Sequence, residues 1–171
     1  MPYFLLLISS LSRIISHPAN LTPVGAISIY ATQKYGFKKS ILITICALVI
    51  SDIFLGFGYY TLSVYIGFIA YIIFQKLFKK FKLSSVYSAI CGSTFFFLVT
   101  NFSVFLGPWY EHTLEGLIKC FILALPFYRN MIIGDIGFLA VIFGLEYLVN
   151  KIMRRKIWRT NLRLTNSTQK Y

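Results

Sequence analysis

The sequence predicts an all-α membrane protein with about six transmembrane helices and one short interfacial or half-inserted helix. Apolar residues make up 57% of the 171-residue chain and charged residues only 13%, against roughly 25% charged in soluble globular proteins. The mean hydropathy is +0.72. The apolar residues form long runs between short polar turns, which indicates a surface that faces lipid.

Seven apolar stretches are the expected helices. The first two are shorter than the roughly 20 residues that span a bilayer, so a re-entrant hairpin is the alternative to two crossings. The sixth stretch carries Glu115 and Lys119 one turn apart and ends at Pro126, which favours an interfacial helix separate from the last span. The stretches are residues 3–16, 22–35, 40–56, 60–77, 84–106, 113–125 and 129–150.

Basic residues set the expected orientation. The chain has 17 Lys and Arg against 5 Asp and Glu, a net charge of +12. They gather after the second stretch, after the fourth and in the tail, whereas the turns between carry none. Because cytoplasmic loops are enriched in Lys and Arg, we expect a multi-pass protein of the cell inner (cytoplasmic) membrane with both termini cytoplasmic. Residues 1–150 would form one polytopic domain and residues 151–171 a basic cytoplasmic tail near anionic lipid; no nucleic-acid partner is expected.

Motifs of known catalytic chemistry are absent from the sequence. It contains no GxxxxGK[ST], GxSxG or HExxH pattern, and His17 and His112 are far apart. The three cysteines lie singly in apolar stretches, where they are expected to pack as small apolar residues. We therefore expect no catalytic residue, metal site or cofactor, and no enzyme activity.

Polar residues inside the apolar stretches point to a binding site. Ionisable groups in a bilayer are costly and usually face the interior of the helix bundle. With the orientation above, the polar residues fall in the outer half of the membrane, while the inner halves read as nearly pure apolar helix. An outward-facing pocket for a small solute is the economical interpretation. Its candidate residues are Asn20, Asp52, Asn101, Arg129, Asn130 and Asp135.

A purely structural interpretation stands beside it. Asp52 and Asp135 could pair with Arg13 and Arg129 as buried ion pairs that fix helix register. In that case the chain would be a membrane scaffold or assembly protein rather than a solute-binding one.

Several short sequences carry a resemblance to a known family. They run from about residue 13 to residue 148 and are NLTPVGA at 20–26, SDIFLG at 51–56, TNFSV at 100–104, ALPFYRN at 124–130 and GD at 134–135. Together they resemble uncharacterised bacterial integral membrane proteins related to the substrate-binding (S) components of energy-coupling factor transporters.

The resemblance implies an S-component-like bundle that binds a vitamin or metal ion in an outward-facing pocket. It also implies docking on a transmembrane coupling subunit with two ATPases. An AxxxA-type docking pattern, common on the first helix of S components, is missing here; the second stretch offers only Gly25, Ala26, Ser28 and Ala31. The expected partners are thus the lipid bilayer, a small solute and this coupling machinery.

Overall fold

The computed structural model describes residues 2–15 and 20–168, with side chains described up to Arg154. The described residues form six α-helices and one 3₁₀ turn, without any strand, which confirms the all-α class. The helices are α1 (Pro2–Ile14), α2 (Val24–Tyr35), α3 (Phe37–Leu55), α4 (Thr61–Leu77), α5 (Ser84–Phe105) and α6 (Leu114–Thr168), and the 3₁₀ turn is η1 (Phe78–Lys80).

The chain divides into two compact units, Met1–Leu139 and Ala140–Tyr171. The first holds α1 to α5 and the beginning of α6. In the second, which continues helical to Thr168, the Lys151 ammonium lies 5.8 Å from the centre of the Tyr147 ring. The division falls inside the last apolar stretch, and the boundary expected at residue 150 stays a prediction.

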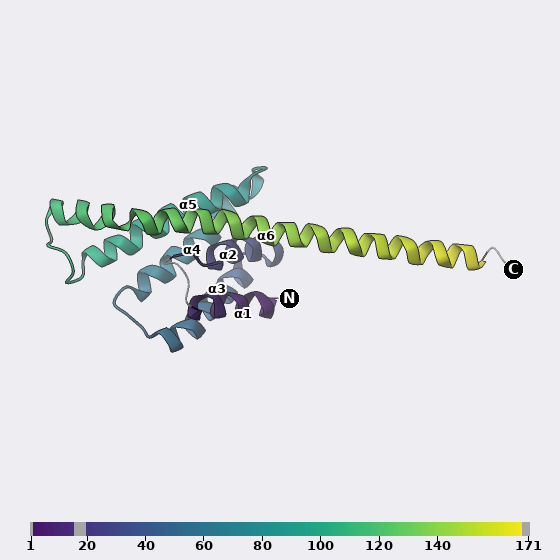
Figure 1. Cartoon of the computed structure of the whole chain (residues 1–171), viewed down its shortest axis with the longest axis horizontal. Helices are drawn as coiled ribbons and strands as arrows, with labels where there is room; N and C mark the ends of the chain where they lie inside the picture. The colour runs from purple at the N-terminus through teal and green to yellow at the C-terminus, as the bar shows by residue number, and fades with distance from the viewer. Residues whose placement is uncertain (1, 16–19, 169–171) are drawn as a thin grey trace. The chain divides into compact units, whose positions relative to one another are not determined.

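Helix α2 is the core of the first unit. It packs against α1, α3, α4 and α5, as can be followed in Figure 1. Its small residues Ala26, Ser28 and Ala31 are completely buried, because short side chains let neighbouring helices approach closely. The same residues are therefore already used in packing within the unit.

Three helical segments are long and apolar enough to cross a membrane: Thr61–Lys80, Ser84–Phe105 and Leu114–Arg154. The apolar helix α1 has 13 residues and α2 has 12, which are too short for a perpendicular crossing. Many large apolar side chains lie exposed on the surface of the protein, among them Leu42, Ile53 and Leu62. These features fit a membrane protein; a count of six crossings stays a prediction.

The separate interfacial helix expected at residues 113–125 is not present. Those residues from Leu114 onward form the first turns of α6, which continues through Pro126. A proline removes one backbone hydrogen bond and disfavours a helix in water, but long membrane helices tolerate it. The expectation of a break at Pro126 was wrong for this reason.

The helix ends next to the lysine-rich turns are also less apolar than expected. Gln75 and Ser88 are buried there, and the Gln75 amide donates to the Ser84 hydroxyl at 3.3 Å. Ser28 and Thr44 share a buried 2.8 Å hydrogen bond between α2 and α3. Ser28 and Thr44 satisfy each other in this way, whereas the Gln75 amide oxygen is buried without a hydrogen-bond partner among the described residues. The absence of charged residues therefore did not indicate an absence of buried polar groups.

Candidate functional site: a cavity with aromatic and charged walls

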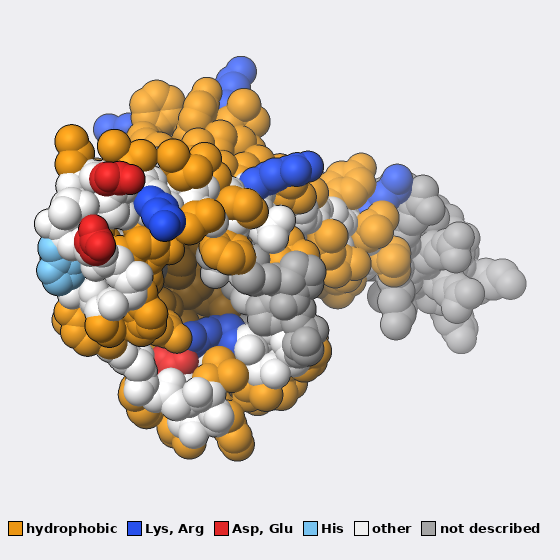
Figure 2. All heavy atoms as spheres, turned by 60° about the vertical axis from the view of Figure 1, so that its left-hand side comes forward, with side chains coloured by type: hydrophobic (Ala, Val, Ile, Leu, Met, Phe, Trp, Pro, Cys, Tyr) orange, Lys and Arg blue, Asp and Glu red, His pale blue; other side chains and the backbone are white. Residues whose placement is uncertain are grey.

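A cavity of about 220 Å³ lies within the first unit. Figure 2 shows a hollow on this face of the molecule, with apolar side chains around it and basic and acidic side chains inside. Described residues from α1, the α1–α2 connection, α4, α5 and α6 line it. They are Arg13, Asn20, Thr22, Tyr60, Val64, Phe68, Tyr71, Phe96, Met131 and Asp135.

One face of α4 supplies much of this lining. Tyr60 precedes the helix, and Val64, Phe68 and Tyr71 follow at intervals of four, four and three residues. Side chains at this spacing lie above one another on one helix face. The Phe68 ring centre lies 4.8 Å from that of Phe96 and 6.0 Å from that of Tyr71, so the rings form a continuous wall.

Asp135 of α6 forms the polar end of this wall. Its Oδ2 atom accepts a 2.6 Å hydrogen bond from the Tyr71 hydroxyl and a 2.7 Å hydrogen bond from the Ser93 hydroxyl. The Ala26 backbone N–H, in the first turn of α2, also donates to this carboxylate. A buried carboxylate that accepts several hydrogen bonds is held in one orientation. Asp135 thereby ties α2, α4, α5 and α6 together.

Gly25 makes room for this arrangement. A Cβ atom on Gly25 would lie against the Asp135 carboxylate and 2.8 Å from the Tyr71 ring, and one on Gly92 would lie against the same ring. The Tyr71 ring thus fits between α2 and α5 only because both helices carry glycine where they face it.

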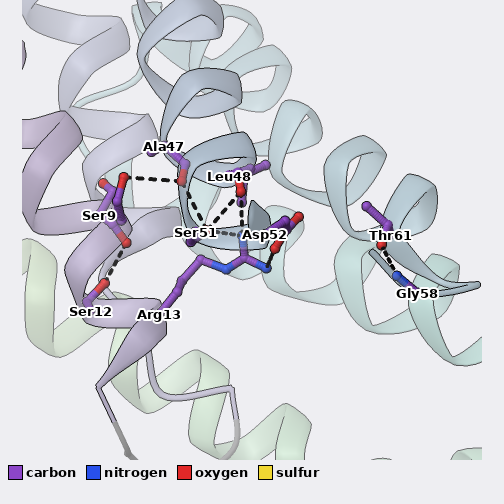
Figure 3. Close-up of polar contacts among 10 residues, drawn as sticks. Ser9, Ser12, Arg13, Ala47, Leu48, Ser51, Asp52, Gly58 and Thr61 are labelled. Carbon is purple, nitrogen blue, oxygen red and sulfur yellow. Dashed lines mark hydrogen bonds and ion pairs between the residues drawn. The ribbon is translucent and has the colours of Figure 1, made fainter. Parts of the chain in front are cut away.

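The Arg13–Asp52 ion pair borders the cavity on another side. Arg13 Nη2 lies 2.8 Å from Asp52 Oδ1, and Nη1 donates to the Ser51 hydroxyl at 2.6 Å and to the Leu48 carbonyl at 3.3 Å. Figure 3 shows the guanidinium reaching from α1 across to these atoms of α3. The side chains of Arg13 and Asp52 are 15% and 5% exposed, so the pair fixes α1 against α3.

A second cavity of about 290 Å³ adjoins the first. Asn20, Tyr60, Val64 and Phe96 line both. The second cavity continues along α5 past Thr100 and Asn101 towards Cys120 and Phe127. The Asn101 amide donates its N–H to the Phe97 carbonyl at 2.7 Å. Together the two cavities are of a size typical of small-ligand sites.

The structure brings four of the six sequence-predicted residues to this region. Asn20 lines both cavities, Asp135 the first and Asn101 the second, while Asp52 holds the cavity-lining Arg13. Asn20 has a φ of +62°, a left-handed conformation that asparagine tolerates better than most residues. It lies in the connection that leads from α1 into α2, which begins at Val24.

Arg129 and Asn130 are placed differently. Among the described residues that line the two cavities, neither appears, and Arg129 is exposed whereas Asn130 is half-buried. Residues six apart in a helix lie about 120° apart around its axis, so Arg129 cannot share a face with Asp135. The ion pair between them that the sequence left open is not formed; Asp135 bonds Tyr71 and Ser93 instead.

Sequence reasoning missed the aromatic wall. Tyr60 and Phe96 line both cavities, although neither is among the six candidate residues. The recurrence of Tyr60, Val64, Phe68 and Tyr71 on one helix face was the available signal. It was hidden because α4 is apolar almost all round.

Comparison with known proteins adds the family. The model of one protein family matches residues 1–158 of the chain. The chain belongs to DUF6580, a family of unknown function. No curated protein and no solved structure matches this DUF6580 chain.

Proposed function

We propose that this DUF6580 protein binds a small solute as part of a membrane transport system, in the manner of an S component. The observation that carries the proposal is the pair of adjoining cavities, into which Arg13, Asn20, Asn101 and Asp135 bring polar groups from four parts of the chain. Ligand sites typically combine mostly apolar walls with a few placed polar groups. No catalytic step is part of the proposal.

The lining supports an organic solute over a metal ion. Within residues 2–15 and 20–168, no group of three or more His, Cys, Asp or Glu side chains could hold a metal ion. The cavity instead offers aromatic faces, amide groups, one guanidinium and the Asp135 carboxylate, which suit a polar organic molecule with an apolar part.

The orientation proposed from loop charge places the cavities on the outer side of the cell inner membrane. Tyr60 lines both cavities and Tyr110 lines the second. Both tyrosines lie in turns without basic residues, whereas the lysine-rich turns would be cytoplasmic. A coupling subunit with ATPases is the proposed partner. The small face of α2 is buried, so docking would use another surface.

A filled cavity tests the proposal. Val64 lines both cavities and Ile66 is exposed on the same helix, so Val64→Phe narrows the site while Ile66→Phe adds a similar volume outside it. Purified protein would be screened for thermal stabilisation by a panel of cationic, anionic, zwitterionic and neutral solutes, and solutes that stabilise it would be titrated by calorimetry. We expect Val64→Phe to abolish binding and Ile66→Phe to retain it.

A membrane scaffold is the second candidate. The Arg13–Asp52 pair favours it, because the candidate site residue Asp52 already has its ionic partner within the protein and needs no solute to balance its charge. Solute binding at the cavity would be rejected if no panel solute stabilised the wild-type protein, or if the Val64→Phe and Ile66→Phe variants bound equally well. The scaffold function would then be the remaining candidate.

A further inference from the structure

The charges around the first cavity are unequal. Arg13 lines the cavity but is paired with Asp52 at 2.8 Å, so its charge is balanced locally. Asp135 also lines the cavity and is 2% exposed. Among the described residues no Lys or Arg forms an ion pair with it. Asp135 is therefore a carboxylate that hydrogen bonds orient and that no cation among the described residues balances.

The surroundings of this carboxylate are aromatic. Tyr60, Phe68, Tyr71 and Phe96 line the same cavity, and the Tyr71 ring leads directly to Asp135 through its 2.6 Å hydrogen bond. Aromatic faces carry partial negative charge and attract organic cations, most strongly where water is excluded. A buried carboxylate beside several rings is the arrangement that recognises alkylated ammonium groups.

We propose that the cavity binds its solute through a cationic organic group, a protonated amine or a quaternary ammonium, seated between Asp135 and the rings of Phe68, Tyr71 and Phe96. This inference rests on the proposed function and names the chemical class of its solute. The cation balances the negative charge of the Asp135 carboxylate, and the remainder of the solute extends past Phe96 and Val64 into the second cavity.

Isosteric probes separate charge from shape. Choline and its uncharged carbon analogue 3,3-dimethyl-1-butanol have nearly the same shape, so a difference in their binding reports on the positive charge. Calorimetry on the purified full-length protein is expected to show saturable choline binding, with the analogue at least about tenfold weaker, the scale of desolvated cation–π and charge contacts. Equal binding of the two probes would overturn the proposal.

Two sets of variants locate the site. Asp135→Asn keeps the size of the side chain and removes its charge, and it is expected to weaken choline binding at least about tenfold. Glu115→Gln removes a carboxylate from the first turn of α6, away from this cavity, and should leave choline binding unchanged. Should Asp135→Asn fail to fold, Phe68→Tyr is expected to retain binding while Phe68→Leu weakens it, because only the ring is needed. Equal choline affinity in all these variants would overturn the proposal.

The screening panel distinguishes failure of this inference from failure of the proposed function. If neutral or anionic solutes bind in a Val64→Phe-sensitive way and no cation does, the cationic class is wrong and the solute-binding function stands. If no class of solute binds, the proposed function itself fails.

Discussion

The Tyr71 hydroxyl donates a 2.6 Å hydrogen bond to Asp135 Oδ2, joining two helices across 64 residues of sequence. Ser93 adds a third helix to this contact through its own 2.7 Å hydrogen bond to Oδ2. Buried polar groups of this kind are costly when unpaired and specify one packing arrangement when satisfied. The polar cluster that Asp135 forms with Tyr71 and Ser93 beside the cavity is thus also a structural centre of the first unit.

Removing the Tyr71 hydroxyl should destabilise the protein. Tyr71→Phe keeps the ring between α2 and α5 but takes one donor from a buried carboxylate, which costs about 1–3 kcal/mol. Equilibrium unfolding in mixed detergent micelles would measure the loss. Tyr87→Phe, at an exposed position of α5, is the matched control and should change little. An unfolding free energy for Tyr71→Phe equal to that of the control would show that the contact contributes nothing.

Glycine positions around Tyr71 should be intolerant of even one methyl group. Gly25→Ala and Gly92→Ala place a Cβ atom against the Tyr71 ring, and overpacking of this kind costs about 1–3 kcal/mol. Gly137→Ala is the control in α6, where a Cβ atom would meet nothing within 4 Å. There the better helix propensity of alanine should leave stability equal or slightly higher. The comparison uses thermal unfolding followed by circular dichroism, and a Gly92→Ala variant as stable as Gly137→Ala would contradict the close packing.

The Arg13–Asp52 pair should show strong coupling in a double-mutant cycle. Asp52→Leu leaves the Arg13 guanidinium largely buried without its carboxylate, which is expected to cost about 3–5 kcal/mol. Arg13→Met together with Asp52→Leu removes both charges and should be closer to the wild type. The cycle is measured from unfolding free energies of the two single variants and the double variant. Additive effects would mean that the 2.8 Å ion pair has no net coupling.

The sequence predicted the helical class and part of the site, for physical reasons that differ between residues. Long apolar runs identify helices directly, and the cost of burying charge identified Asp52 and Asp135 as interior residues, both of which are buried. Their partners depend on helix rotation. Asp52 pairs with Arg13, as the structural interpretation of the sequence predicted. Asp135 instead lies on a different face of α6 from Arg129 and accepts a hydrogen bond from Tyr71 on α4. Helix α6 likewise passes through Pro126, because the length of a membrane helix outweighs one missing hydrogen bond.

Orientation in the membrane is the remaining prediction, and single cysteines test it. Cys46, Cys91 and Cys120 would first be replaced by serine or alanine, after which Gly58→Cys and Lys80→Cys place one thiol in each kind of turn. Because the turn at Lys79 and Lys80 is basic and that at Gly58 is not, the positive-inside rule predicts that only Gly58→Cys reacts with a membrane-impermeant maleimide in intact spheroplasts. Both should react after permeabilisation, which controls for accessibility. Labelling of Lys80→Cys in intact spheroplasts would invert the topology and place the cavity lined by Tyr60 and Asp135 towards the cytoplasm, where an uptake protein could not collect its solute.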